Sequence, residues 1–179
     1  MKKLLIVVDY QNDFVTGSLG FSGAELLEEP ILKKIKAYEA AGDHIIYTFD
    51  THYDDYLETR EGRGLPIAHC IKETDGHALY GDVFTHYQAR TYEHQEEVFK
   101  DTFGSADLMK MLIEREQYEV IELVGLVSYI CVFSNAIIAK TAHPEAEIVV
   151  DATCTAGPDQ ELHDACMTLM REALQIKVL

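Results

Sequence analysis

Basic residues are scarce in this sequence, and their scarcity excludes two kinds of partner. The 179 residues include 15 Lys and Arg against 31 Asp and Glu, which gives a formal net charge of -16 at pH 7. Nucleic acids and anionic membranes would be repelled by such a surface, because both attract proteins through Lys and Arg. We therefore expect neither as a partner, and the charge leaves the ligand open.

Long apolar runs and cysteine pairs are also missing. No stretch approaches the ~20 apolar residues that a membrane helix needs, and the run at 4–8 stops at Asp9, too early for a signal peptide. The cysteines form no CxxC pair and are too few for a disulfide scaffold; they are Cys70, Cys131, Cys154 and Cys166. These absences predict a cytoplasmic protein with reduced thiols.

Apolar runs of strand type alternate with segments of helical spacing. Strands are predicted at residues 4–9, 44–50, 96–101, 119–125, 146–152 and 175–179. Helices are predicted at residues 28–43, 105–117, 128–143 and 158–174. The polar segment 51–95 shows no clear period and is predicted to be a long functional loop. The alternation indicates an α/β fold in a single domain, 1–179, with one doubly wound, mainly parallel sheet between two helical layers.

Residues with chemical potential follow several of these strands. Asp9, Asp50 and the segment 125–131 come at strand ends, and Lys100 closes the strand at 96–101. Ligand sites of doubly wound sheets lie beyond the carboxyl ends of the strands, so we expect these residues to converge. Taken singly, each also has a plain explanation: a turn-forming acid, a solvated lysine, or, for Cys131, a small core residue.

Together, Asp9, Lys100 and Cys131 fit the needs of a nucleophilic thiol. A cysteine with an ordinary pKa of about 8.5 is mostly protonated at neutral pH and must be activated. A helix N-terminus, a nearby ammonium group and a carboxylate that takes the proton would each help. Cys131 lies near the start of the helix predicted at 128–143, where backbone N–H groups could also hold an oxyanion.

A second group of residues suits a metal ion. Asp50 and His52 are two residues apart after a strand, His69 follows in the long polar segment, and Glu61 is a further candidate ligand. One carboxylate and two imidazoles suit Zn²⁺, Fe²⁺ or Mn²⁺ with positions left open. A chance cluster is the alternative, because the same segment carries further histidines, His77, His86 and His94.

Five motifs in order resemble the isochorismatase-like cysteine hydrolases, and within them the nicotinamidase branch. The motifs are VVDYQNDFVTGSL (7–19), DTH (50–52), PIAHC (66–70), FKDTFGS (99–105) and GLVSYICVFSNA (125–136). They span nearly the whole chain. The resemblance implies the isochorismatase-like, Rossmann-like three-layer fold and hydrolysis of a small carboxamide, most simply nicotinamide.

The resemblance also implies catalytic roles. Cys131 would be the nucleophile, Asp9 the acid and base, and Lys100 the cation that holds both in their ionised forms. The Leu126–Val127 bond would be cis, with the amides of Val127 and Cys131 forming the oxyanion hole.

The implied ligand sites complete the prediction. Asp50, His52 and His69 would hold one divalent metal, zinc before iron or manganese, that contacts the pyridine nitrogen. Phe14 would form an aromatic wall of the pocket. The family usually has another aromatic shortly before the second histidine, whereas this chain has the aliphatic segment 65–68, so Phe103 or a tyrosine from 80–92 is the predicted substitute. Tyr129 replaces an Asp or Asn of the family and is left without a role.

Three alternatives stay open. The substrate could be another small amide or a carbamoyl compound. A receiver-like phosphoacceptor domain would also gather strand-end acids and a lysine, but it leaves Cys131, His52 and His69 without a purpose. A metal-binding or partner-binding protein without turnover is the third. The resemblance adds an expectation of a homo-oligomer.

Overall fold

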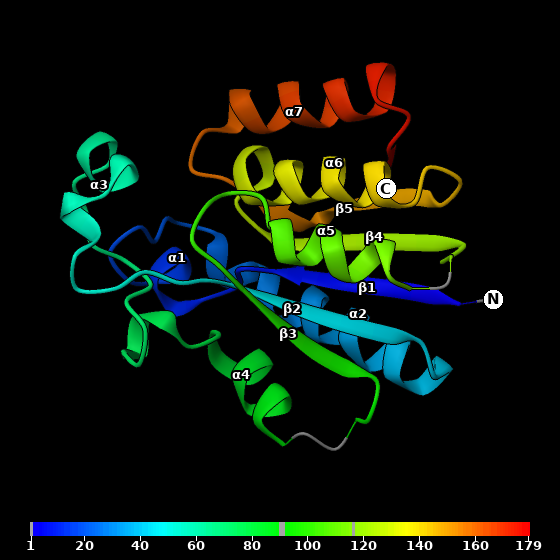
Figure 1. Cartoon of the computed structure of the whole chain (residues 1–179), viewed down its shortest axis with the longest axis horizontal. Coiled ribbons are helices and arrows are strands. Elements are labelled where there is room, and N and C mark those ends of the chain that lie inside the picture. Colours follow the sequence, from blue (N-terminus) through cyan, green and yellow to red (C-terminus); the bar gives the residue numbers. More distant parts are fainter. Residues whose placement is uncertain (1, 90–91, 116) are drawn as a thin grey trace.

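A single six-stranded sheet forms the centre of the molecule in the computed structural model, which describes residues 2–89, 92–115 and 117–179 (Figure 1). Its strands are β1 (Lys3–Val8), β2 (His44–Asp50), β3 (Gln95–Lys100), β4 (Val120–Leu126), β5 (Glu147–Ala156) and β6 (Lys177–Val178). The spatial order is β3-β2-β1-β4-β5-β6, and all five neighbouring pairs are parallel. The predicted doubly wound α/β fold is confirmed.

Helices cover both faces of the sheet. They are α1 (Asn12–Val15), α2 (Glu28–Ala41), α3 (Arg60–Gly64), α4 (Gly81–Gln88), α5 (Ala106–Ile113), α6 (Phe133–Ala142) and α7 (Gln160–Ala173). Helices α5, α6 and α7 share one apolar core with the sheet, while α2 and α4 share the other (Figure 1). No helix in the described part of the chain is both long enough and apolar enough to cross a membrane.

Local sequence explains where the elements begin and end. The strand residues Leu4–Val8 are fully buried, since a parallel sheet is covered on both faces. Helix α2 ends at Gly42, whose φ of 75° is a conformation that glycine adopts without strain. Helix α5 begins after Ser105, whose hydroxyl accepts the N–H of Leu108 at 3.0 Å.

Several predicted boundaries differ from the structure. The segment 51–95 is not one long loop, because it contains α3 and α4 and two short 3-10 helices. The helix predicted at 105–117 ends at Ile113, and of that prediction residue 116 lies outside the described residues. The helix predicted at 128–143 begins with a π-helical turn, Ser128–Val132, before α6.

The direction in which successive strands are added to the sheet reverses between β1 and β4, and the candidate site lies at this point. Successive strands extend from β1 through β2 to β3 on one side, and from β4 through β5 to β6 on the other. The two neighbouring strands therefore send their chains apart at their carboxyl ends, which opens a crevice there. Asp9 follows β1, and the turn that carries Cys131 follows β4.

Candidate active site and metal centre

Lys100 joins the predicted catalytic residues to the predicted metal ligands. Its Nζ atom lies 2.6 Å from Asp9 Oδ2, 3.3 Å from Asp50 Oδ1 and 3.6 Å from Cys131 Sγ. The lysine side chain is only 1% exposed. Burial alone lowers the pKa of Lys100, but the charges of Asp9, Cys131 and Asp50 raise it above the ordinary lysine value. Lys100 is therefore a fixed ammonium group at the centre of the site.

Thr48, a residue that was not predicted to belong to the site, holds the Asp9 side chain in place. The Thr48 hydroxyl on β2 donates to Asp9 Oδ1 at 2.6 Å, and the Asp9 side chain is fully buried. Burial raises the pKa of Asp9 above the usual carboxyl range, while Lys100 and Thr48 act in the opposite direction. A carboxyl group with a raised pKa is suited to accept and return a proton.

Cys131 lies in a turn whose backbone requires particular residues. The Leu126–Val127 peptide bond is cis, as the sequence resemblance implies. Just before it, Gly125 has a φ of 111°, and a Cβ atom there would lie 2.0 Å from the Val8 carbonyl oxygen. Only glycine fits this close approach of β4 to β1. The turn then places Cys131, 6% exposed, next to Lys100.

The resemblance implies that Lys100 keeps Cys131 and Asp9 in their ionised forms, whereas the raised pKa of the Cys131 thiol in the structure favours its protonated form. Burial raises this pKa well above the ordinary thiol value, and the charges of Asp9 and Asp50 raise it further. Lys100 lowers it, but by less than burial raises it. Lys100 thus favours the ionised forms of Cys131 and Asp9 without outweighing burial, so a thiol that loses its proton during the reaction fits this site.

The three predicted metal ligands converge at the carboxyl end of β2. One ligand atom each of Asp50, His52 and His69 lies within 4.8 Å of the others, and all three residues are buried. His52 Nε2 lies 3.1 Å and His69 Nε2 3.3 Å from Asp50 Oδ2. His69 Nδ1 lies 2.8 Å from the Ile67 carbonyl, which can only accept, so Nδ1 is a donor, and Nε2 carries the lone pair when the ring is neutral.

This donor set fits a divalent cation. Two imidazole nitrogens and a carboxylate oxygen that face one another are the usual partial ligand set of zinc and related ions. Burial alone raises the pKa of Asp50, but His52, His69 and Lys100 bring it well below its usual range. The carboxylate is therefore available as a ligand. Glu61, the further candidate, has its Oε1 atom 3.8 Å from His52 Nε2.

An aromatic ring stands beside the metal ligands although the segment before His69 has none. The Tyr56 ring centroid lies 4.6 Å from that of His52 and 5.0 Å from that of His69, and Tyr56 is 1% exposed. Tyr56 comes from a 3-10 helix thirteen positions before His69 in the sequence. No sequence signal distinguished it from the other tyrosines nearby.

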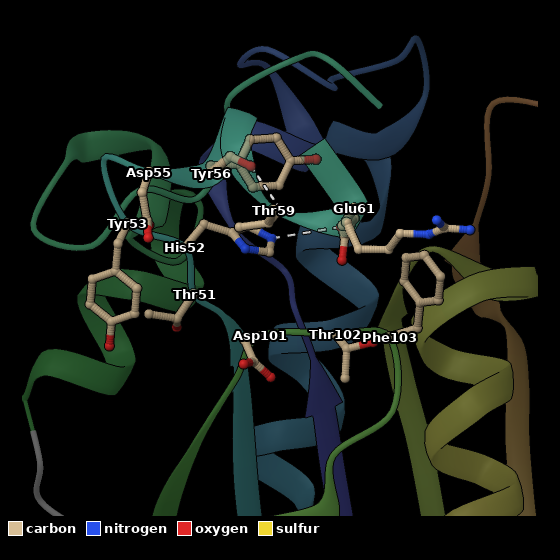
Figure 2. A pocket seen from close by; sticks show the side chains of 11 residues that line it. Thr51, His52, Tyr53, Asp55, Tyr56, Thr59, Glu61, Asp101, Thr102 and Phe103 are labelled. Carbon is tan, nitrogen blue, oxygen red and sulfur yellow. Dashed lines mark hydrogen bonds and ion pairs between the residues drawn. The ribbon is translucent and has the colours of Figure 1, made fainter. Parts of the chain in front are cut away.

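A cavity of about 590 Å³ opens beside this centre, and Figure 2 shows the side chains around it. It is lined by His52, Tyr56, Glu61 and Phe103, among others. A second cavity of about 340 Å³ shares the 101–102 segment with the first and reaches Lys100. Phe103 is 47% exposed and lines the first cavity, and its contact with a substrate stays a prediction.

Phe14 occupies a different position from Phe103. It is 8% exposed and its ring centroid lies 5.6 Å from that of His69. Phe14 therefore supports the metal side of the site.

Asn135 connects the backbone of Cys131 to that of Phe103. Its Nδ2 atom donates to the carbonyls of Cys131 at 2.8 Å and Phe103 at 3.1 Å.

The structure also explains Tyr129. Its hydroxyl oxygen accepts the N–H of Asp159 at 3.2 Å, just before α7, and its ring covers Gly157. A Cβ atom at Gly157 would lie 2.3 Å from Tyr129 Cε1. Tyr129 therefore fastens the turn that carries Cys131 to the segment between β5 and α7.

Comparison with known proteins places this arrangement in a family. The isochorismatase domain profile matches residues 3–178. The chain belongs to the isochorismatase family. The uncharacterized isochorismatase family protein PncA of Bacillus subtilis (strain 168) is 33% identical over 170 residues, which cover 91% of each chain.

Solved structures of the isochorismatase family superpose closely on this chain. The crystal structure of nicotinamidase PncA from Bacillus subtilis has a TM-score of 0.89 at 29% identity and covers 99% of both chains. The pyrazinamidase of Pyrococcus horikoshii in complex with zinc shares the fold, with a TM-score of 0.82 at 22% identity over 100% of this chain and 99% of that one. The predicted family is confirmed, and the relatives support the predicted class, a hydrolase that acts on amides.

Proposed function

We propose that this protein is a cysteine amidohydrolase that converts nicotinamide to nicotinate and ammonia. The observation that carries the proposal is the contact of one buried ammonium group, Lys100, with Asp9, Cys131 and the metal ligand Asp50. An ammonium group in this position can stabilise a thiolate and a carboxylate together, while the neighbouring cavity receives the amide. The similarity to a nicotinamidase supports the choice of substrate.

The first half of the reaction forms a thioester. Asp9, as the carboxylate, takes the proton of the Cys131 thiol, and Lys100 stabilises the thiolate that results. The sulfur attacks the carboxamide carbon, and the N–H groups of Val127 and Cys131 hold the oxygen that becomes negative. The C–N bond then breaks, and the amine takes the proton from Asp9 and leaves as ammonia.

The second half releases the acid. Asp9 is again a carboxylate and takes a proton from a water molecule, whose oxygen attacks the thioester carbon. The C–S bond breaks, the proton returns from Asp9 to the sulfur, and nicotinic acid leaves and gives up its remaining proton to the ammonia or to water, becoming nicotinate. The raised pKa of Asp9 suits this repeated transfer, because a group whose pKa is nearer neutrality both gains and loses a proton readily.

The remaining residues would bind and orient the substrate. Asp50, His52 and His69, with Glu61 as a further ligand, would hold a divalent cation, of which zinc fits the donor set best. When bound, the ion supplies a Lewis acid for the ring nitrogen of the substrate. Phe103 would contact the pyridine ring from the cavity, and Phe14 would close the pocket behind His69. A cytoplasmic location agrees with four free, buried cysteines.

An ammonia-release assay on the wild type and on Cys131→Ala tests the proposal. The wild type is expected to release ammonia from nicotinamide, and the variant is expected to lose at least a thousandfold of that rate. The matched control is Cys154→Ala, which removes another buried thiol that is not in contact with Lys100, Asp9 or Asp50. Activity that survives in Cys131→Ala contradicts the thioester route.

The same assay separates the substrate from the chemistry. A panel of pyrazinamide, benzamide and a carbamoyl amino acid is run beside nicotinamide. Turnover of another amide without turnover of nicotinamide would correct the substrate and keep Cys131 as the nucleophile. Mass spectrometry of the protein quenched during turnover is expected to show an acyl adduct on the peptide that contains Cys131.

A further inference from the structure

The short helix α1 and the residue before it lie against the metal centre without supplying any of the donor atoms described above. The Gln11 carboxamide contacts Asp50, the Asp13 carboxylate contacts Cys70, and the Phe14 ring lies against His69. We call Gln11 and Asp13 the bracket.

Gln11 continues the sheet where β1 has already ended. The register of β1 with β2 ends at Val8 and Thr48, so β1 does not pair with Asp50. The Gln11 side chain, fully buried, takes the place of that strand: its Oε1 accepts the Asp50 N–H at 2.8 Å and its Nε2 donates to the Asp50 carbonyl at 2.9 Å. Both backbone groups of a metal ligand are thereby fixed by one side chain.

Asp13 fixes the second ligand segment from the other direction. Its Oδ2 accepts the N–H of Cys70, the residue after His69, at 2.7 Å, and its Oδ1 accepts the N–H of Ser18 at 3.2 Å. Cys70 has a φ of 46°, a left-handed conformation that non-glycine residues adopt only where the surroundings hold them. A carboxylate is needed here, because both of its oxygens accept from a backbone N–H.

The space around Asp13 admits that carboxylate and little else. A Cβ atom at Gly17 would lie 2.3 Å from Asp13 Oδ1, and one at Gly76 would lie 2.1 Å from Asp13 Oδ2. The two glycines therefore leave room for the carboxylate in the position from which it reaches Cys70. The three atoms nearest to an added methyl group at Gly76 would be those of the Asp13 carboxylate, the end of a side chain, so the group is expected to displace the carboxylate and leave the fold intact.

We propose that Gln11 and Asp13 are positioning residues of the metal centre, which act through the backbone of Asp50 and Cys70. The inference rests on the metal site of the proposed function and adds to it the groups that set its geometry. Groups that orient metal ligands commonly change metal affinity 10- to 100-fold when they are removed. We expect the bracket to have an effect of that size.

Zinc affinity, measured by competition with a chromogenic chelator, tests the bracket. Asp13→Asn replaces one accepting oxygen by an amide group, and Gly76→Ala keeps the carboxylate but moves it. Both variants are expected to bind Zn²⁺ about 10- to 100-fold more weakly than the wild type. The matched control is Asp43→Asn, because Asp43 also accepts a backbone N–H, that of Lys3 at 3.0 Å, at the opposite end of β1.

Two further measurements separate positioning from loss of stability. The chelator-treated proteins are melted, and Asp13→Asn and Asp43→Asn are expected to lose similar stability, while only the former loses zinc affinity. The absorption spectrum of bound Co²⁺ is expected to change in Gly76→Ala and to stay unchanged in Asp43→Asn.

Each outcome has a distinct meaning. Wild-type zinc affinity in both Asp13→Asn and Gly76→Ala overturns the positioning role of Asp13 and leaves the metal centre standing. Equal losses of affinity in Asp13→Asn and Asp43→Asn overturn it as well, because the effect would then be general. A wild-type protein that takes up no Zn²⁺ overturns the metal centre and the bracket together, while the ammonia assay on Cys131→Ala still tests the catalytic proposal by itself.

Discussion

Replacing Lys100 by methionine would leave two buried carboxylates without their cation. Methionine keeps the length and much of the volume of the side chain and removes the charge. Coulomb's law at an effective dielectric constant of about 20 gives attractions of roughly 6 kcal/mol at the 2.6 Å to Asp9 and 5 kcal/mol at the 3.3 Å to Asp50. Relief of the desolvation of Lys100 offsets part of this, and removal of one partner from a buried pair typically costs about 3–5 kcal/mol.

The loss is expected to depend on pH with a definite sign. Burial already raises the pKa of Asp9, and without Lys100 it rises further above the unfolded value of about 4. A carboxyl group with a raised pKa in the folded protein favours the fold below the unfolded pKa and disfavours it as the pH rises through the folded pKa. The destabilisation of Lys100→Met relative to the wild type should therefore be largest near pH 7 and shrink toward pH 4.

Urea denaturation at several pH values, with Asp9→Asn as a second variant, tests this reasoning. Asp9→Asn removes the charge and keeps an oxygen that can accept from Thr48, so Lys100→Met/Asp9→Asn is expected to be more stable at pH 7 than Lys100→Met alone. A loss under about 1 kcal/mol in Lys100→Met, independent of pH and unchanged by Asp9→Asn, would refute the view that Lys100 compensates the buried carboxylates.

Three further results are expected. In Thr48→Val the hydrogen bond that lowers the pKa of Asp9 is lost, so the acidic limb of the pH profile of kcat/KM should move to higher pH; an unmoved limb argues against Asp9 as the base. Gly157→Ala should cost about 1–3 kcal/mol, mainly through its clash with Tyr129, and the loss should be smaller in the Tyr129→Leu background, where only the tight contact with Val127 Cγ1 remains, when both are measured by denaturation. Zinc at 100 times its dissociation constant should stabilise the chelator-treated wild type by about 2.7 kcal/mol, and a melting curve of Asp50→Asn that responds equally would contradict the ligand set.

The alternation of apolar runs was enough to predict the sheet and most of its helices. The strands at 44–50 and 119–125 were predicted within one residue, because a strand buried on both faces is a continuous apolar run. Helix α3 and helix α4 were missed, since both are short and polar, and α4 packs against α2, which lies far away in the sequence. The π-helical turn at 128–132 was missed for a related reason: its form depends on contacts with α7, such as the 2.9 Å between Ser128 Oγ and His163 Nδ1.

The sequence by itself determined which reactive residues this protein has and that they stand at strand ends. Parallel strands bring their carboxyl ends to one edge, so Asp9, Asp50, Lys100 and the Cys131 turn had to share a region. Only the tertiary structure decided their protonation and their supports. Burial, which raises the pKa of Asp9 and Cys131 against the effect of Lys100, depends on the complete packing around them. The contacts of Gln11 with Asp50 and of Asp13 with Cys70 join segments far apart in the chain, and no local pattern encodes such distances.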